Sequence, residues 1–256
     1  MTTTEISSDT QRGLRTWNLV AAELHVAPAV AVVALATDFA LPVTASYLAG
    51  PPGTTPQEPT VLFDLSTGLA VAAFLALSAV AHLVVSTVWF RGYVGDLSRG
   101  INRARWVEYA LSSSLMMVVI AQLVGIADVT ALLAIVGVNA SMILFGWLQE
   151  KYEQPGGGGW LPFWFGCIAG AVPWVAVVLY VVAPQSPSEE SAPGFVYGIV
   201  VSLFLFFNVF ALNQWLQYRA RGRWADYLFG ERVYIVLSLV AKSLLAWQVF
   251  GGTLAG

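Results

Sequence analysis

Residues 233–247 read VYIVLSLVAKSLLAW, an apolar run of helical length with one charged residue, Lys242, near its middle. A charge at the centre of a bilayer costs about 2.5–3.5 kcal/mol on insertion scales, so it needs a partner or a covalent modification. Lys242 lies too far from either end of the run for its amine to reach the membrane surface easily. The run therefore predicts a membrane-spanning helix built around an unusual lysine.

The rest of the 256-residue chain has the same apolar character. Hydrophobic residues make up 57% of it and charged residues only 11%, whereas about a quarter of a typical soluble domain is charged. Stretches long enough to cross a bilayer as helices fall at about 17–36, 66–89, 104–125, 129–149, 161–183, 194–218 and 232–252. We expect an all-α, multi-pass protein of the cell membrane, with residues 1–256 forming a single seven-helix domain behind a polar N-terminal segment, residues 1–16.

Basic residues indicate the orientation of the bundle. Apart from Lys242, all eleven remaining Lys and Arg residues lie in the N-terminal segment, in the connections after the second, fourth and sixth stretches, or in the first two residues of the stretches that follow those connections. The other connections and the C-terminal end carry none. Because cytoplasmic loops retain positive charge, we expect a cytoplasmic N-terminus and an external C-terminus.

The connection at residues 37–65 is too long for a simple turn. Residues 43–48 and 60–63 are rich in Val, Leu, Tyr and Phe and flank a Pro/Gly segment, which predicts an external β-hairpin. An irregular loop is an equally good interpretation of the local pattern. A hairpin would expose an apolar edge, so we expect it to support a homodimer.

Five ionisable residues fall inside the predicted spans: Lys242, Glu108, His82, His25 and Glu23. At a rise of about 1.5 Å per residue, the first four lie in the inner half of the membrane, which predicts one cluster. A desolvated lysine loses its proton readily and condenses with aldehydes to form a Schiff base. The alternative is a buried Lys–Glu pair that ties helices together.

Serines extend this cluster at helical spacing. Ser112 and Ser238 lie one turn from Glu108 and Lys242, and Ser78 lies one turn from the histidine of its span. The pattern predicts a polar stripe that could hold water.

These features resemble a known family. A lysine in the seventh span, Glu108 in the third, and the segment Arg105–Tyr109 (RWVEY) resemble microbial rhodopsins, and the inverted orientation narrows the resemblance to heliorhodopsins. Further matching segments are Asp38–Pro42 (DFALP), Gly50–Thr55 (GPPGTT), Ser112–Ser114 (SSS), Gly137–Trp147 (GVNASMILFGW) and Ser238–Ser243 (SLVAKS).

The resemblance implies that all-trans retinal is attached to Lys242 as a protonated Schiff base, with Glu108 as its counterion. In rhodopsin pumps the position of Ser238 usually holds a second carboxylate, so Glu108 would be the only anionic partner. The resemblance further implies retinal contacts at Tyr109, Ser112, Ser113, Met116, Asn139, Ile143, Gly146, Trp164, Phe207, Phe210, Gln214 and Ser238.

The function implied is that of a light sensor that signals to an unknown cytoplasmic protein. The proton released after light would reach an acceptor cluster of His25, His82 and Glu23. Net pumping is not expected, because the outer halves of the spans lack ionisable residues and Val119 stands where many outward proton pumps of this superfamily carry a carboxylate.

Two other classes of function stay open on sequence alone: a light-driven pump or light-gated channel, and a light-independent transporter or membrane scaffold. No motif for enzymatic or metal chemistry is evident. A net charge of −3 gives no basic field for nucleic acid.

Overall fold

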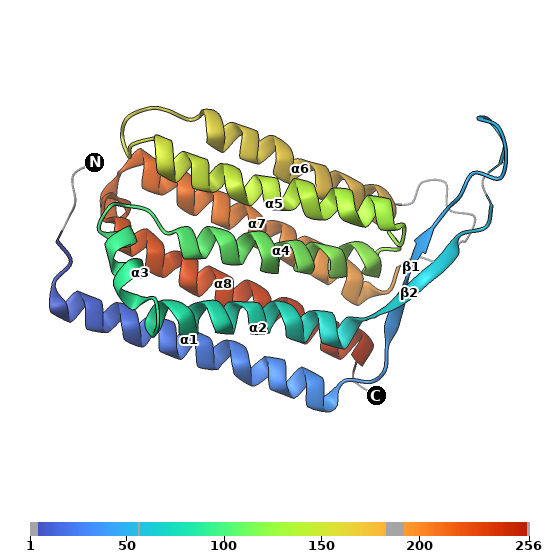
Figure 1. Cartoon of the computed structure of the whole chain (residues 1–256), viewed down its shortest axis with the longest axis horizontal. Coiled ribbons are helices and arrows are strands. Elements are labelled where there is room, and N and C mark those ends of the chain that lie inside the picture. Colours follow the sequence, from blue (N-terminus) through green and yellow to red (C-terminus); the bar gives the residue numbers. More distant parts are fainter. Residues whose placement is uncertain (1–4, 56, 183–191, 255–256) are drawn as a thin grey trace.

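The chain forms a bundle of long helices with a β-hairpin at one end (Figure 1). The computed structural model describes residues 5–55, 57–182 and 192–254. Within these ranges the elements are α1 (Ser8–Leu35), β1 (Ala40–Ala45), β2 (Thr60–Ser66), α2 (Thr67–Ser86), α3 (Phe90–Leu97), α4 (Arg103–Leu123), α5 (Val129–Tyr152), α6 (Leu161–Val182), α7 (Gly194–Arg219), the 3₁₀ turn η1 (Gly222–Ala225), α8 (Tyr227–Val249) and the π-helical turn η2 (Phe250–Leu254).

The seven predicted spans are confirmed. In the described part of the chain, seven helices are long and apolar enough to cross a membrane. α1 begins at Ser8, nine residues before the predicted start, because the Ser7 hydroxyl accepts a hydrogen bond from the Thr10 amide and caps the helix. Most of the described polar N-terminal segment is therefore helical, while residues 1–4 lie outside the described residues.

The short helix α3 was not predicted. It lies between α2 and α4 at the end of the bundle opposite the hairpin (Figure 1). Asp96 of α3 is buried and pairs with both Arg99 and Arg103. Tyr93 points into the bundle and is almost fully buried. α3 thus closes one end of the bundle with an aromatic side chain and an ion-pair cluster.

The predicted hairpin is confirmed, and the irregular-loop alternative is wrong. β1 and β2 pair antiparallel from Ala40 opposite Ser66 to Ala45 opposite Thr60. The first strand runs over residues 40–45 instead of the predicted 43–48, because the ladder starts with Ala40 opposite Ser66, the last residue before α2. The Thr44 amide also donates to the carbonyl of Ala127, which ties the hairpin to the turn before α5.

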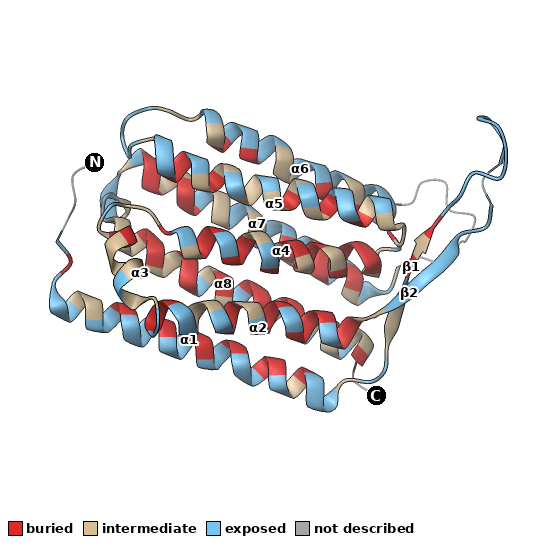
Figure 2. Ribbon diagram, in the orientation of Figure 1, coloured by how far each residue is buried: buried red, intermediate tan, exposed pale blue. Residues whose placement is uncertain are grey.

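The interior changes character along the bundle axis. Toward the hairpin, apolar side chains from several helices form one large core that includes Phe74, Met117, Ile120, Leu203 and Leu245. Buried residues face inward and exposed residues cover the outer faces of the helices (Figure 2). Many of those exposed residues are Leu, Val and Phe, as expected for lipid-facing helices. Buried polar residues gather toward the α3 end, where the candidate site lies.

Candidate functional site

Lys242 is buried in α8 and forms an ion pair with Glu108 of α4. Its Nζ lies 2.7 Å from Glu108 Oε1, and both side chains are almost completely inaccessible. Removing two charges from water is costly, and their attraction offsets that cost only when geometry is close and the remaining hydrogen bonds are made. The two residues that the sequence predicted to meet are in direct contact.

Two serine hydroxyls complete the hydrogen bonding of the lysine. Nζ lies 2.6 Å from Ser78 Oγ of α2 and 2.9 Å from Ser238 Oγ, one turn earlier in α8. Ser78 Oγ in turn donates to Glu108 Oε1 over 2.6 Å. An ammonium carries three donors, and with Glu108 the site supplies one acceptor for each. The arrangement therefore stabilises a positive charge at Nζ.

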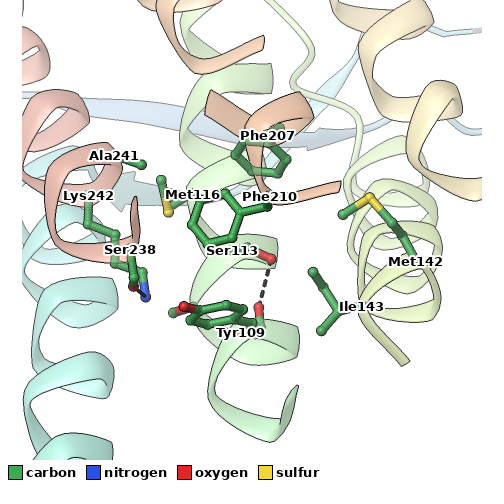
Figure 3. Close-up of a pocket in the computed structure, with 11 residues that line it drawn as sticks. Tyr109, Ser113, Met116, Met142, Ile143, Phe207, Phe210, Ser238, Ala241 and Lys242 are labelled. Carbon is green, nitrogen blue, oxygen red and sulfur yellow. Dashed lines mark hydrogen bonds between the residues drawn. The ribbon is translucent and has the colours of Figure 1, made fainter. Parts of the chain in front are cut away.

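An apolar cavity extends from Lys242 toward α5 (Figure 3). Its lining residues come from α4, α5, α7 and α8: Tyr109, Ser112, Ser113, Met116, Met142, Ile143, Phe207, Phe210, Ser238, Ala241 and Lys242. The charged amine is therefore at one side of a largely aromatic and aliphatic space.

A second cavity continues this space toward α6. Tyr109, Phe207 and Phe210 line both cavities. Gly146 lets α4 and α5 pack closely there, because a Cβ at this position would lie 2.5 Å from the ring of Trp106. An amine with a carboxylate partner at the edge of a long apolar space fits the predicted retinal.

A polar cavity lies on the α3 side of the ion pair. Glu108 lines it together with Asn18, His82 and Tyr93, and its empty volume is about 390 Å³. The ring of His25, which is fully buried, stacks on His82 with centroids 5.7 Å apart and planes 13° apart. Burial raises the pKa of the Tyr93 hydroxyl, which therefore stays neutral. Glu108 thus separates an apolar cavity from a polar one.

Arg105 carries a second buried ion cluster at this end. Its guanidinium pairs with Glu150 of α5 over 2.7 Å and also with Glu231 of α8. The Asn102 side chain donates to Glu231, while the Trp106 indole donates to Glu150. These contacts join the ends of α4, α5 and α8, and Asn102, Arg105 and Glu231 form part of the wall of the polar cavity.

A comparison with known protein families indicates the function of this site. The sequence model of the heliorhodopsin family matches residues 14–254, nearly the whole chain. The chain belongs to the heliorhodopsin family. Heliorhodopsins are retinal-binding microbial rhodopsins, so the cavity beside Lys242 belongs to a retinal protein of the membrane. The comparison with curated proteins found no match.

Most of the retinal contacts predicted for this heliorhodopsin line one of the two apolar cavities. Gly146 and Gln214 line the second cavity, and the Gln214 amide donates to the Gly146 carbonyl over 2.9 Å. Asn139 does not line either cavity; it donates to the hydroxyls of Ser113 and Ser114 and so holds part of the wall in place. The remaining predicted residues on the cavity walls are Tyr109, Ser112, Ser113, Met116, Ile143, Phe207, Phe210 and Ser238.

Two predicted site residues face away from the heliorhodopsin interior. Trp164 is 57% exposed on α6, whereas its neighbour Phe163 lines the second cavity. Glu23 is exposed on α1, whereas His25 is buried. Glu23 and His25 are two positions apart and so lie about 200° apart around the helix, whereas the adjacent Phe163 and Trp164 lie about 100° apart. In each pair the neighbour is the residue that faces the interior, so both predictions chose the wrong face.

Several site residues were not predicted. Asn18 and Tyr93 carried no signal in the sequence, because a single Asn or Tyr near a helix end is ordinary. Glu150 and Glu231 lie close to the predicted span ends, where carboxylates normally face water. The buried Arg105 is the one clue that could have been used, because an arginine inside a span requires acidic partners.

Proposed function

We propose that this heliorhodopsin is a light sensor in which all-trans retinal is bound to Lys242 and Glu108 is the counterion. The contact between Lys242 Nζ and Glu108 at the edge of the apolar cavity is the observation that carries the proposal. Tyr109, Phe207 and Phe210 supply aromatic walls for the polyene. Ser238, in place of a carboxylate, leaves Glu108 as the anion at the amine.

The residues around Nζ control where its proton resides. When bound, retinal supplies a light-driven double-bond isomerisation next to a cationic nitrogen. Glu108, Ser78 and Ser238 all lie within hydrogen-bond distance of Nζ. A retinal-linked Nζ would carry a single hydrogen for one of these acceptors, and the carboxylate of Glu108 would favour its charged form. A displacement of Nζ from Glu108 removes this stabilisation, and the proton can leave toward the polar cavity.

His82 and His25 are the proposed proton acceptors. His82 shares the polar cavity with Glu108, and His25 stacks on it. Glu23 is excluded from this role because its side chain is exposed on the outer face of α1.

The proposed signal leaves through the α3 end of the bundle. Glu231 lines the polar cavity, and Glu150 lines a further cavity between η1, the start of α8 and the α3–α4 turn. A new charge at His82 would alter the field at Arg105, which bridges these two carboxylates. The basic loops lie at this end, so we assign it to the cytoplasm, where a signalling protein would bind.

A homodimer completes the proposal. β2 is exposed along most of its length, and Val61, Phe63 and Tyr47 each have more than half of their surface exposed. An exposed apolar strand is a template for pairing with another chain. A second copy of the heliorhodopsin would cover it.

The retinal site can be tested by colour. Cells that express the protein with added retinal are expected to show a visible absorption band that Lys242→Ala abolishes. The matched control is Lys151→Ala, because Lys151 is the only other lysine and lies in the exposed last turn of α5. A colourless wild-type protein that is folded would contradict the proposal and favour a light-independent transporter or scaffold.

A further inference from the structure

Asn18 of α1 is buried between two helices and contacts His82. Its Nδ2 donates to the backbone carbonyl of Leu14 over 2.8 Å and to the Tyr93 hydroxyl over 3.3 Å. Its Oδ1 lies 2.8 Å from His82 Nδ1. Only 2% of its surface is exposed. All three contacts of its amide are therefore made inside the protein.

These contacts fix the orientation of the amide. The Leu14 carbonyl can only accept a hydrogen bond, so the nitrogen of Asn18 must face it. The oxygen of Asn18 then faces His82 and can only accept. His82 Nδ1 must therefore carry a hydrogen, and in the neutral ring Nε2 is the nitrogen with a free lone pair.

We infer that Asn18 is a positioning residue that holds His82 in its Nδ1–H tautomer and makes Nε2 the atom that takes up the proton. The acceptor half of this inference rests on the proposed function; the tautomer does not. The transfer breaks the N–H bond at Lys242 Nζ, forms one at His82 Nε2 and moves one positive charge with it. The hydrogen bond from Nδ1 to Asn18 is kept and becomes charge-assisted, so the ring need not turn.

His25 has no comparable support. Among the described residues, neither nitrogen of His25 has a hydrogen-bond partner, although the ring is fully buried. Its position depends on packing and on the stack with His82. The structure therefore distinguishes the two histidines: His82 has a defined accepting nitrogen, and His25 does not.

The tautomer can be read directly by ¹⁵N nuclear magnetic resonance. The chain contains two histidines, so replacing one leaves a single histidine to observe. In His25→Gln protein labelled with ¹⁵N-histidine, every side-chain signal comes from His82. We expect a protonated Nδ1 and an unprotonated Nε2 in the dark. Asn18→Leu should give a mixture of tautomers, whereas Asn18→Asp, which still offers an acceptor oxygen, should keep the Nδ1–H form.

Thr16→Val is the matched control, because the exposed Thr16 side chain, also on α1, donates to a carbonyl one turn earlier, that of Arg12, and makes no bond to His82. It should leave the His82 signals unchanged. Retention of the visible band in each variant shows that the fold survives. A dark wild-type His82 with hydrogen on Nε2, or one whose tautomer is indifferent to Asn18→Leu, would overturn the role of Asn18.

Illumination separates this inference from the proposed function. In protein that retains both histidines, Asn18→Leu should slow light-induced deprotonation at Lys242 by about tenfold, the effect expected from losing one orienting hydrogen bond. Asn18→Asp should restore the rate. An Nε2 signal that becomes protonated under light supports the accepting atom. If both histidines stay neutral under light, the acceptor role in the proposed function fails, and so does the assignment of His82 Nε2 as the accepting atom. The tautomer of His82 in the dark still decides the role of Asn18.

Discussion

Arg105 and Glu150 lie 2.7 Å apart in the interior of the bundle, where each side chain has 5% or less of its area exposed. Removing one member of a buried pair leaves the other charge uncompensated. We expect Glu150→Gln to lower the free energy of unfolding by about 3 kcal/mol, or the melting temperature by roughly 6–12 °C. Thermal loss of the visible band measures this effect. Glu153→Gln, one turn later and partly exposed, should change the melting temperature little.

Glu108→Gln should convert the visible band to a near-ultraviolet band at neutral pH. The variant keeps the shape of the side chain but removes the carboxylate that contacts Lys242 Nζ. The control is Glu23→Gln, which should leave the spectrum unchanged because Glu23 faces away from the bundle. Absorption spectra of the purified proteins decide the matter, and an unaltered visible band in Glu108→Gln would remove Glu108 from the counterion role.

Gly146→Ala should disturb the retinal site. The added Cβ would lie 2.5 Å from the Trp106 ring, and overpacking of this kind typically costs about 1–3 kcal/mol. We expect a lower yield of coloured protein and a lower melting temperature. Gly137→Ala on the same helix is the control, because a Cβ there meets no atom within 4 Å. If the two variants give the same yield of coloured protein and the same melting temperature, the Trp106 ring can move to accommodate the added methyl group without loss of stability.

Illuminated liposomes should show neither a sustained pH change nor a steady photocurrent. For a proton that leaves Lys242 toward His82, the described residues offer no relay in the opposite direction, where Val119 lies in the apolar core. Transient deprotonation should still appear in flash spectroscopy. A stationary photocurrent that reverses with voltage would instead identify a channel and overturn the sensor proposal.

Charged residues on β2 should separate the proposed dimer. Val61 and Phe63 are both exposed, and replacing both by Asp would place like charges at the interface. We expect monomers in mild detergent by light scattering, and deletion of about residues 45–60 should give the same result. Val88→Asp is the control, since Val88 is exposed and lies between α2 and α3, the helix at the end of the bundle opposite the hairpin. Dimers that persist in both hairpin variants would place the interface elsewhere.

The amino-acid sequence by itself determined the number of spans and the meeting of Lys242 with Glu108, but left a hairpin and an irregular loop equally open for residues 37–65. Length and hydropathy set where each helix crosses the membrane, and the rise per residue sets the depth of each side chain. Depth was enough to bring the lysine and the glutamate together, because both are too costly to bury apart.

Only the tertiary structure decided which face of each helix turns inward. In lipid an apolar helix has little preferred rotation, because Leu or Val is as stable against lipid as against protein. Rotation is set by packing against neighbours, so Glu23 and Trp164 face outward while Asn18 meets His82. The partners of a buried polar group come from helices distant in sequence, and their contact exists only once the bundle has assembled.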